Sequence, residues 1–265
     1  MTYAVMQTGL MPPSAEQLKN AFQQVPGLAP MDVNVLGKDA CGVLIKGFEL
    51  ERASIMQSAL AAQGVETKIV EDAVLPELPP PRQLAKVEFA PDGLLTDDLV
   101  NRKILLEWNN ILLIAAGRAR LTDFTREVIS KPMKRSGRDG NAGPKLLINT
   151  VTREEQKDHL LLEIIMRGNA SRYHVKADRP EAWLLFGCLG ERRSRNPAAN
   201  LSLFVRDMAK HAPSALLNQG ALDMRENVNA SLCYPSQTAF YREITWLLWM
   251  AASGRARGWF TTSND

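Results

Sequence analysis

Hydrophobic side chains in the first 70 residues follow two periodicities, and together these predict a small mixed fold. Some stretches repeat at the spacing of one helix face, whereas others alternate with polar residues as half-buried strands do. The expected elements are a strand at 3–10, a helix at 14–25, strands at 31–35 and 43–46, a helix at 49–63 and a strand at 65–69. Ser14 and Gln17 form a capping box at the start of the first helix.

The resulting order over residues 3–70, βαββαβ, resembles the ferredoxin-like split βαβ fold, in which two helices cover a four-stranded antiparallel sheet. The resemblance rests on element order alone and implies no particular activity, because such folds carry unrelated functions. Residues 42–46 lack the aromatic side chains that RNA-recognition motifs stack on bases, and no C-x-x-C follows the first strand. The remaining interpretation is a small docking or regulatory module.

Four prolines within residues 76–81 interrupt this pattern. Proline neither continues a helix nor fits a central strand, and clustered prolines favour extended, semi-rigid chain. We therefore predict a ferredoxin-like domain at 1–74, a linker at 75–83 and a second domain at 84–265.

The second domain begins with β-compatible segments and ends with helical ones, which is an α+β layout. Antiparallel strands are expected at 146–148, 160–166 and 172–176, after a β-compatible run at 111–117 and a long polar loop at 123–144. Helical spacing follows from residue 179 onward, and Ser236 can cap the last helix. A pleckstrin-homology-like sheet with a terminal helix is an alternative arrangement.

Three short motifs in this half resemble an uncharacterised bacterial family of unknown function. They are W-x-x-I-x-x-I-A-A-G-R from Trp108 to Arg118, R-Y-x-V from Arg172 to Val175, and E-I-x-W-L-L-W from Glu243 to Trp249. The resemblance implies a bacterial protein and assigns it no activity.

Charge is distributed unevenly, although the whole chain carries only +3. Residues 118–145 contain eight basic and three acidic side chains, which gives a local excess of +5. Such an arm attracts an anion or a nucleic acid backbone, unless it is simply a solvated loop. The candidate anion- or ligand-binding residues are Arg118, Arg120, Arg135, Arg138, Arg172, Arg192 and Arg193. The cluster containing Arg192 and Arg193 also fits a helix C-terminus.

Three carboxylates, Glu107, Glu163 and Glu243, interrupt or border apolar runs and are therefore candidates for burial. A buried carboxylate needs a partner. The candidate partners are Arg118, Arg120, Arg167, Arg172 and Arg242. The set is interpreted either as a structural ion-pair network or as part of a ligand pocket.

Catalytic and metal-binding signatures are missing from the sequence. It has no G-x-S-x-G, no H-E-x-x-H and no phosphate-binding glycine loop, and its three cysteines include no C-x-x-C. His159 and His174 could be cross-strand neighbours, most simply as a structural pair. We therefore expect no metal and no cofactor.

These observations favour a cytoplasmic, non-catalytic binding or regulatory protein whose partner is another protein or a small ligand. No run approaches 18 apolar residues, so no membrane association is expected. One alternative is a nucleic-acid- or phosphate-binding protein that uses residues 118–145, and another is an enzyme with an inter-domain site. Trp259 and Phe260, beyond the last helix, are expected to dock on this chain or on a second copy in a homo-oligomer.

Overall fold

The computed structural model describes residues 1–9, 12–84, 86–97, 102–132, 146–169, 171–228 and 233–254. Helices and several sheets are combined in it, which confirms the α+β class. Among the described residues, no helix has the length and apolar character needed to cross a membrane. The predicted docking of Trp259 and Phe260 falls outside the described residues.

The N-terminal part contains a small antiparallel sheet with helices on one side. Its strands are β1 (Tyr3–Gln7), β2 (Val43–Phe48) and β3 (Thr67–Glu71), in the order β2-β1-β3. The helices are α1 (Ala15–Gln23), α2 (Pro30–Asp39) and α3 (Leu50–Ala62). The expected capping box is present, because Ser14 Oγ accepts from Gln17 N and Gln17 Oε1 accepts from Ser14 N. Phe22, Leu44 and Met56 lie in the core between these helices and the sheet.

The strand predicted at 31–35 is wrong, since this segment belongs to helix α2. Pro30 occupies the first helical turn, where its missing N–H costs nothing, and Asp32 Oδ2 accepts a hydrogen bond from Ala29 N. Val33 is buried while Met31 and Val35 are exposed, so one helix face accounts for the apolar positions. The described sheet therefore has three strands instead of the expected four.

The C-terminal part is built on a larger sheet in the order β11-β8-β9-β10-β4, with β12 also paired to β8. Its strands are β4 (Pro81–Gln83), β8 (Ile111–Pro132), β9 (Leu146–Met166), β10 (Arg172–Lys176), β11 (Leu216–Leu217) and β12 (Cys233–Tyr234). A smaller sheet contains β5 (Val87–Phe89), β6 (Gly93–Asp97) and β7 (Lys103–Glu107). The main helices are α4 (Ala182–Leu185), α5 (Pro197–His211), α6 (Gln219–Glu226) and α7 (Gln237–Ala252).

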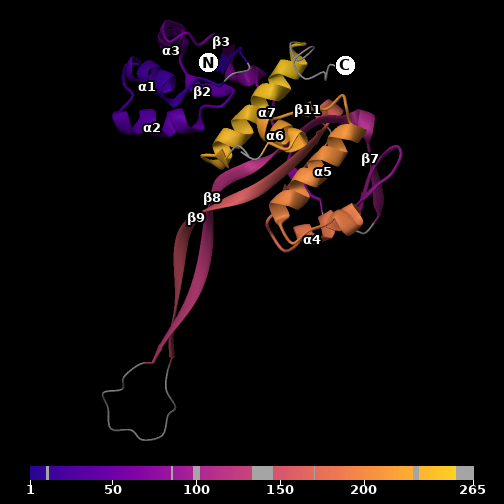
Figure 1. Ribbon diagram of the computed structural model, residues 1–265. Helices are drawn as coiled ribbons and strands as arrows, with labels where there is room; N and C mark the ends of the chain where they lie inside the picture. The colour runs from indigo at the N-terminus through magenta and orange to yellow at the C-terminus, as the bar shows by residue number, and fades with distance from the viewer. Residues whose placement is uncertain are drawn as a thin grey trace, which may run out of the picture.

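Strands β8 and β9 form a long antiparallel ribbon that projects from the body (Figure 1). The polar loop predicted at 123–144 is thus wrong over 123–132, which continues β8. Likewise, the two short strands predicted at 146–148 and 160–166 are parts of β9. Continuous pairing from Gly117↔Leu161 out to Pro132↔Leu146 gives the backbone of each strand a partner in the other.

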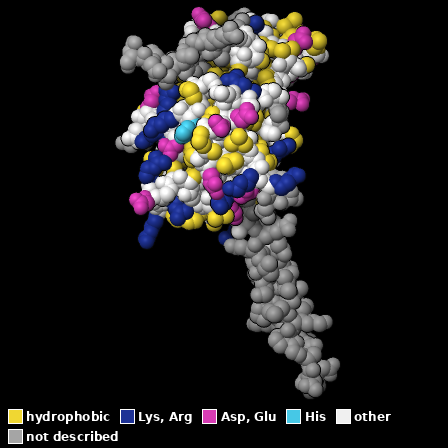
Figure 2. Space-filling view, turned by 90° about the vertical axis from the view of Figure 1, so that its right-hand side faces the viewer, with side chains coloured by type: hydrophobic (Ala, Val, Ile, Leu, Met, Phe, Trp, Pro, Cys, Tyr) yellow, Lys and Arg dark blue, Asp and Glu magenta, His cyan; other side chains and the backbone are white. Residues whose placement is uncertain are grey.

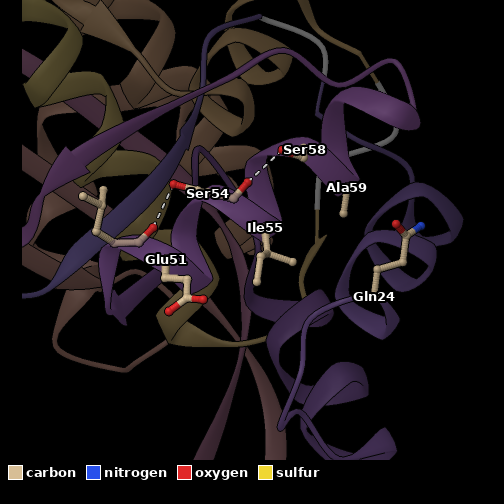
Figure 3. Close-up of a pocket in the computed structure, with 7 residues that line it drawn as sticks. Gln24, Glu51, Ser54, Ile55, Ser58 and Ala59 are labelled. Atoms are coloured by element: carbon tan, nitrogen blue, oxygen red, sulfur yellow. Dashed lines mark hydrogen bonds between the residues drawn. The ribbon is translucent and has the colours of Figure 1, made fainter.

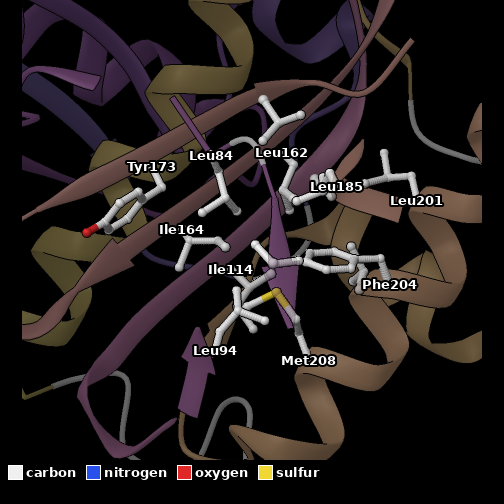
Figure 4. Packing of buried hydrophobic residues seen from close by; sticks show 14 of the residues in the cluster. Leu84, Leu94, Ile114, Leu162, Ile164, Tyr173, Leu185, Leu201, Phe204 and Met208 are labelled. Carbon is white, nitrogen blue, oxygen red and sulfur yellow. The ribbon is translucent and has the colours of Figure 1, made fainter. Parts of the chain in front are cut away.

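Both faces of the sheet are covered near the body. Ile114 and Leu162 face α5, where they pack with Phe204 and Met208 (Figure 4). Leu113 and Leu161 face the opposite side and pack against α7. A strand buried on both faces loses its polar alternation, which explains the continuous apolar run in β8.

Helix α7 lies between the large sheet and the N-terminal part (Figure 1). Trp246 Nε1 donates to Gln7 O at 2.9 Å, and both residues are buried. At Gly42, whose φ is +69°, an added Cβ would lie 2.5 Å from Trp246 Cβ. The N-terminal sheet and α7 therefore share a closely packed contact.

The proline-rich segment also packs on this structure. Leu75 and Leu78 contact the core beneath α7, and β4 pairs in parallel with β10. An edge strand tolerates proline, because only one of its sides donates to the ladder.

Candidate functional site

A cleft with a volume of about 830 Å³ opens where three parts of the chain meet. One wall is strand β2, the second is the segment 72–78 after β3, and the third is helix α7. The lining residues are Val43, Lys46, Gly47, Asp72, Ala73, Leu75, Pro76, Glu77, Leu78, Thr238, Tyr241, Arg242 and Thr245. The cleft thus combines two cations and two carboxylates with hydroxyl and apolar groups.

Arg242 contributes a half-buried guanidinium to the α7 wall. Its Nη1 donates to Leu44 O at 3.3 Å, while Nε is buried and has no hydrogen-bond partner. Burial lowers the pKa of Arg242 below its usual value, although the carboxylate of Asp39 acts in the opposite direction. Arginine stays protonated even so, and this N–H is an unused charged donor.

Asp72 contributes a complementary acceptor at the other wall. Its Oδ2 accepts a hydrogen bond from Gly47 N at 3.0 Å, whereas Oδ1 is buried without a partner. Buried polar atoms in native proteins are nearly always hydrogen-bonded, so an exception needs a physical explanation. Six side-chain atoms in the described part of the chain are of this kind, and those of Arg242 and Asp72 belong to residues that line the same cleft.

Beneath Tyr241 lies a buried cluster centred on Glu163. Arg172 donates to both carboxylate oxygens, from Nε at 2.8 Å and from Nη2 at 2.9 Å, and His174 Nδ1 lies 2.7 Å from Oε1. The Tyr241 hydroxyl donates to the same oxygen at 3.0 Å. Burial alone would raise the pKa of Glu163, but the hydrogen bonds from Arg172 and His174 hold it below its ordinary value.

Glu163 reaches this position because β9 alternates its side chains. Leu161 and Ile165, its neighbours on the same face, pack under α7, so Glu163 is buried there as well. The Arg172 guanidinium lies 4.7 Å from the centre of the Tyr241 ring, which connects the cluster to the cleft. The predicted burial of Glu163 is confirmed, and its partner is one of the predicted arginines.

Glu243 is also buried, but its partners differ from those predicted. The Tyr234 hydroxyl and Gln219 N, the latter at 3.0 Å, donate to it, and Asn218 Nδ2 lies 3.4 Å away. Burial raises the pKa of Glu243, although these hydrogen bonds act to lower it. The predicted arginine partner is therefore wrong, because neutral donors satisfy the carboxyl.

The three carboxylates do not meet in one site. Glu107 is exposed and accepts from Asn110 Nδ2 at 2.7 Å, so its predicted burial is wrong. Glu163 and Glu243 bind different tyrosines, and the Phe240 ring contacts both of those rings. The arrangement offers no pair of carboxylates for acid–base chemistry on one substrate.

The arginine candidates are likewise spread over the molecule. Arg118 is exposed, Arg120 Nε donates to Asp158 at 3.0 Å, and Arg135 and Arg138 lie outside the described residues. Arg192 pairs with Asp207, and the Arg193 guanidinium lies 4.0 Å from the centre of the Trp183 ring.

The face of the molecule seen in Figure 2 also mixes cations and carboxylates, with hydrophobic side chains between them. Several of the candidate arginines in the described part of the chain already have partners, so those described do not form a single anion site.

The two strand histidines are not cross-strand neighbours. His174 lies opposite Glu163, whereas His159 lies between Asp178 Oδ2, at 2.7 Å, and Asp123 Oδ2, at 3.1 Å. No group of three or more potential metal ligands is arranged for an ion in the described part of the chain. Sequence spacing missed these contacts, because Asp178 follows β10 and approaches β9 only in the folded sheet.

A second hollow lies against helix α3, as Figure 3 shows. Ser54 and Ser58 line it, but their hydroxyls donate to Leu50 O at 2.9 Å and Ser54 O at 3.0 Å. Glu51 is the one charged residue in its lining. The hollow therefore offers less to a polar ligand than the cleft at α7.

No family model matches the chain, and the comparisons with curated proteins and with solved structures produced no match either. The functional argument therefore depends on the geometry of the cleft. Sequence reasoning had considered Arg242 only as a partner for a carboxylate, and it had missed Lys46 and Asp72. No local motif marks these residues, since they come together from β2, the segment after β3 and α7.

Proposed function

We propose that this protein is a non-catalytic binding protein whose cleft between β2, residues 72–78 and α7 takes a small polar ligand. The observation that carries the proposal is the convergence of two cations, Lys46 and Arg242, and two carboxylates, Asp72 and Glu77, on the walls of one cleft. The cleft volume of about 830 Å³ is in the range of small-molecule sites, which typically occupy about 300–1,000 Å³.

Binding is favoured over catalysis because the two buried carboxylates are already hydrogen-bonded inside the protein. The carboxylates of Glu163 and Glu243 are held by internal hydrogen bonds, and neither lines the cleft. A general acid or base must come within hydrogen-bond distance of the substrate proton that it transfers. The carboxylates of Glu163 and Glu243 instead accept hydrogen bonds from other residues of the protein. The residues that do line the cleft are suited to charge recognition and positioning.

We expect at least one compound from a panel of amino acids, short peptides, carboxylates and phosphate esters to raise the melting temperature of the full-length protein saturably. A ligand at 100 times its Kd stabilises the folded state by about 2.7 kcal/mol. Arg242→Gln should weaken the binding of that compound tenfold or more, because the substitution removes a charged donor from the cleft wall.

The matched control is Arg225→Gln, which removes an arginine paired with Glu226 outside the cleft. It should leave binding unchanged. The proposal fails if no compound shifts the melting temperature, or if Arg242→Gln binds as tightly as the wild type.

A second candidate function, nucleic-acid binding, is favoured by the β8–β9 ribbon (Figure 1). Beyond Leu121 and Lys157, the described parts of these strands pair only with each other, and the side chains of residues 151–158 are exposed. A lone two-stranded ribbon is marginally stable in water, and one fits the major groove of DNA. The +5 excess within residues 118–145 supports a polyanionic partner.

For this candidate we expect duplex DNA to bind at low salt, with an affinity that falls steeply between 50 and 200 mM salt. Fluorescence anisotropy measures the affinity and its dependence on salt concentration.

The double variant Arg135→Gln/Arg138→Gln should reduce the slope of log affinity against log salt concentration by about 2, if each arginine contacts a phosphate. Arg192→Gln/Arg193→Gln is the charge-matched control. Absence of binding at 50 mM salt, or equal loss in both double variants, would remove this candidate.

A further inference from the structure

We infer that His159 is a pH-sensitive latch at the root of the β8–β9 ribbon, where the root comprises residues 119–125 and 155–160. The protonated ring joins Asp123 on β8 to Asp178 beyond β10, and loss of its proton breaks this connection. The inference goes beyond the proposed functions, since it concerns neither the cleft nor a partner of the ribbon.

His159 lies where the sheet of the body becomes a free ribbon. Its side chain is 4% exposed, whereas residues 151–158, further out on β9, are exposed. In the described chain, the pairing of β10 with β9 extends to Leu161, and Ala177 N then donates to Leu160 O at 2.7 Å. His159 is therefore the first residue of β9 beyond the part of the strand that β10 covers.

Both ring nitrogens of His159 lie within hydrogen-bond distance of a carboxylate. Nδ1 is 2.7 Å from Asp178 Oδ2, and Nε2 is 3.1 Å from Asp123 Oδ2. An ionised carboxylate accepts hydrogen bonds without donating any, and a neutral imidazole has a single N–H, whereas the imidazolium has two. The geometry at both nitrogens therefore fits the protonated ring. Histidine is also the side chain whose charge changes between about pH 5 and pH 8.

The contact between His159 and Asp123 spans a bend in the ribbon. Ala119 lies directly opposite His159, and Asp123 is four residues further out on β8, in a continuous register. Four residues of a straight strand extend about 13 Å. Figure 1 shows that the ribbon changes direction as it leaves the body, which brings the two side chains together. The hydrogen bond from His159 to Asp123 thus belongs to the bent form of the ribbon.

Charged side chains surround the ring on the sheet side, and an apolar cluster lies on the α7 side. The charged groups are Asp123 on β8, Glu155 and Lys157 on β9, and Lys176, Asp178 and Arg179 at the end of β10. Towards α7, Ala119 belongs to a cluster with Ala239, Phe240 and Tyr234, and the Tyr234 hydroxyl donates to Glu243. A change in the charge of His159 is therefore felt first by Asp123 and Asp178.

Loss of the proton leaves two carboxylates with Arg179 as their nearest cation. Arg179 Nη2 donates to Asp123 at 3.0 and 2.8 Å, but its side chain is 43% exposed, and exposed ion pairs contribute little to stability. The neutral ring keeps one N–H, for which Asp178 is the closer acceptor, so the hydrogen bond to Asp123 is lost. The ribbon root is thus held in its bent form at acidic pH and freed as the pH rises.

Nuclear magnetic resonance on the full-length protein tests the latch. Long-range ¹H–¹⁵N correlations report the protonation of both ring nitrogens of His159, which should be charged at about pH 5.5 and neutral at about pH 8.5. The amide resonances of the ribbon root should shift with the same midpoint. Hydrogen exchange, corrected for its intrinsic pH dependence, should show the protection of these amides falling about tenfold at the higher pH.

Two variants change the latch in opposite directions. His159→Gln offers a single uncharged N–H group to the two carboxylates, so protection of the ribbon root should be low at both pH values. Asp123→Asn introduces an amide that can donate to the unprotonated nitrogen of a neutral ring, so protection should persist at the higher pH. Asp158→Asn is the matched control, because Asp158 is paired with Arg120 at the surface of the same strands. It should leave the pH response unchanged.

Three results would overturn the inference. One is a His159 ring that keeps a single charge state over this pH range. Another is a ring that titrates without any change in the protection of the ribbon root. The third is a pH response that Asp123→Asn leaves unaltered, since the response would then belong to another group such as His174, which is buried against Glu163. The measurements on the wild type decide the question if a variant does not fold.

Discussion

Replacement of Arg172 by methionine is expected to lower the free energy of unfolding by about 3–5 kcal/mol, because it leaves the Glu163 carboxylate buried without its main partner. The Glu163 side chain is completely buried and that of Arg172 is only 10% exposed, so water cannot take over the lost hydrogen bonds. Urea denaturation at pH 7, with the slope compared between variants, measures the change.

A double-mutant cycle provides the control for this prediction. Glu163→Leu/Arg172→Met removes both charges, so the double variant should be more stable than Arg172→Met alone. If the two changes instead add up, the buried charge is not the cause of the loss, and the interpretation of the cluster is wrong.

Acidification gives an independent check on the same pair. The pKa of Glu163 is held below its ordinary value of 4.5, so its contribution to stability is present above that pH and is lost as the pH falls through the folded-state pKa. Arg172→Met removes the main hydrogen bonds that lower this pKa. The variant should therefore lose less stability than the wild type on acidification below pH 4.5. An equal loss of unfolding free energy in the two proteins would show that Arg172 does not lower the pKa of Glu163.

Replacement of Trp246 by alanine is the second change expected to have a large effect, with a loss of about 3–5 kcal/mol. The indole is 4% exposed, donates to Gln7 O and packs against Gly42, so its removal opens a cavity between α7 and the N-terminal sheet. Urea denaturation should show the loss of stability. Amide hydrogen exchange should accelerate in β1, whose Gln7 O accepts the indole hydrogen bond, and in β2, which follows Gly42.

Trp183→Ala is the matched control, because Trp183 is 46% exposed and contacts Arg193 at the surface. It should cost less than about 1 kcal/mol and leave exchange in β1 and β2 unchanged. A loss below 1 kcal/mol for Trp246→Ala, or unchanged exchange in those strands, would show that the N-terminal sheet is held by other contacts.

Local sequence signals predicted several elements correctly. The capping box at Ser14 starts α1, and Ser236 caps α7 by accepting from Ala239 N. These features depend on residues three or four positions apart, so the sequence alone carries them.

Other features could not be predicted, because local patterns record which side chains avoid water and leave open what covers them. Residues 31–35 fit a strand until Pro30 and Asp32 are considered as the start of a helix. The polar residues at 123–132 extend β8 because β9 supplies the backbone partners, and no local signal announces that pairing.

Local sequence patterns also left the contacts of the candidate site residues undetermined. Glu107 and Glu163 both border apolar runs, but only Glu163 faces α7 and meets Arg172, while Glu107 ends its strand in solvent. The sequence by itself determined the class of fold, the capped helices and the need of a buried carboxylate for a partner. Only the tertiary structure decided which carboxylates are buried, and it alone brought Lys46, Asp72 and Arg242 into one cleft. The physical reason is that these contacts join segments far apart in the chain, and their geometry is set by packing around α7 and not by local spacing.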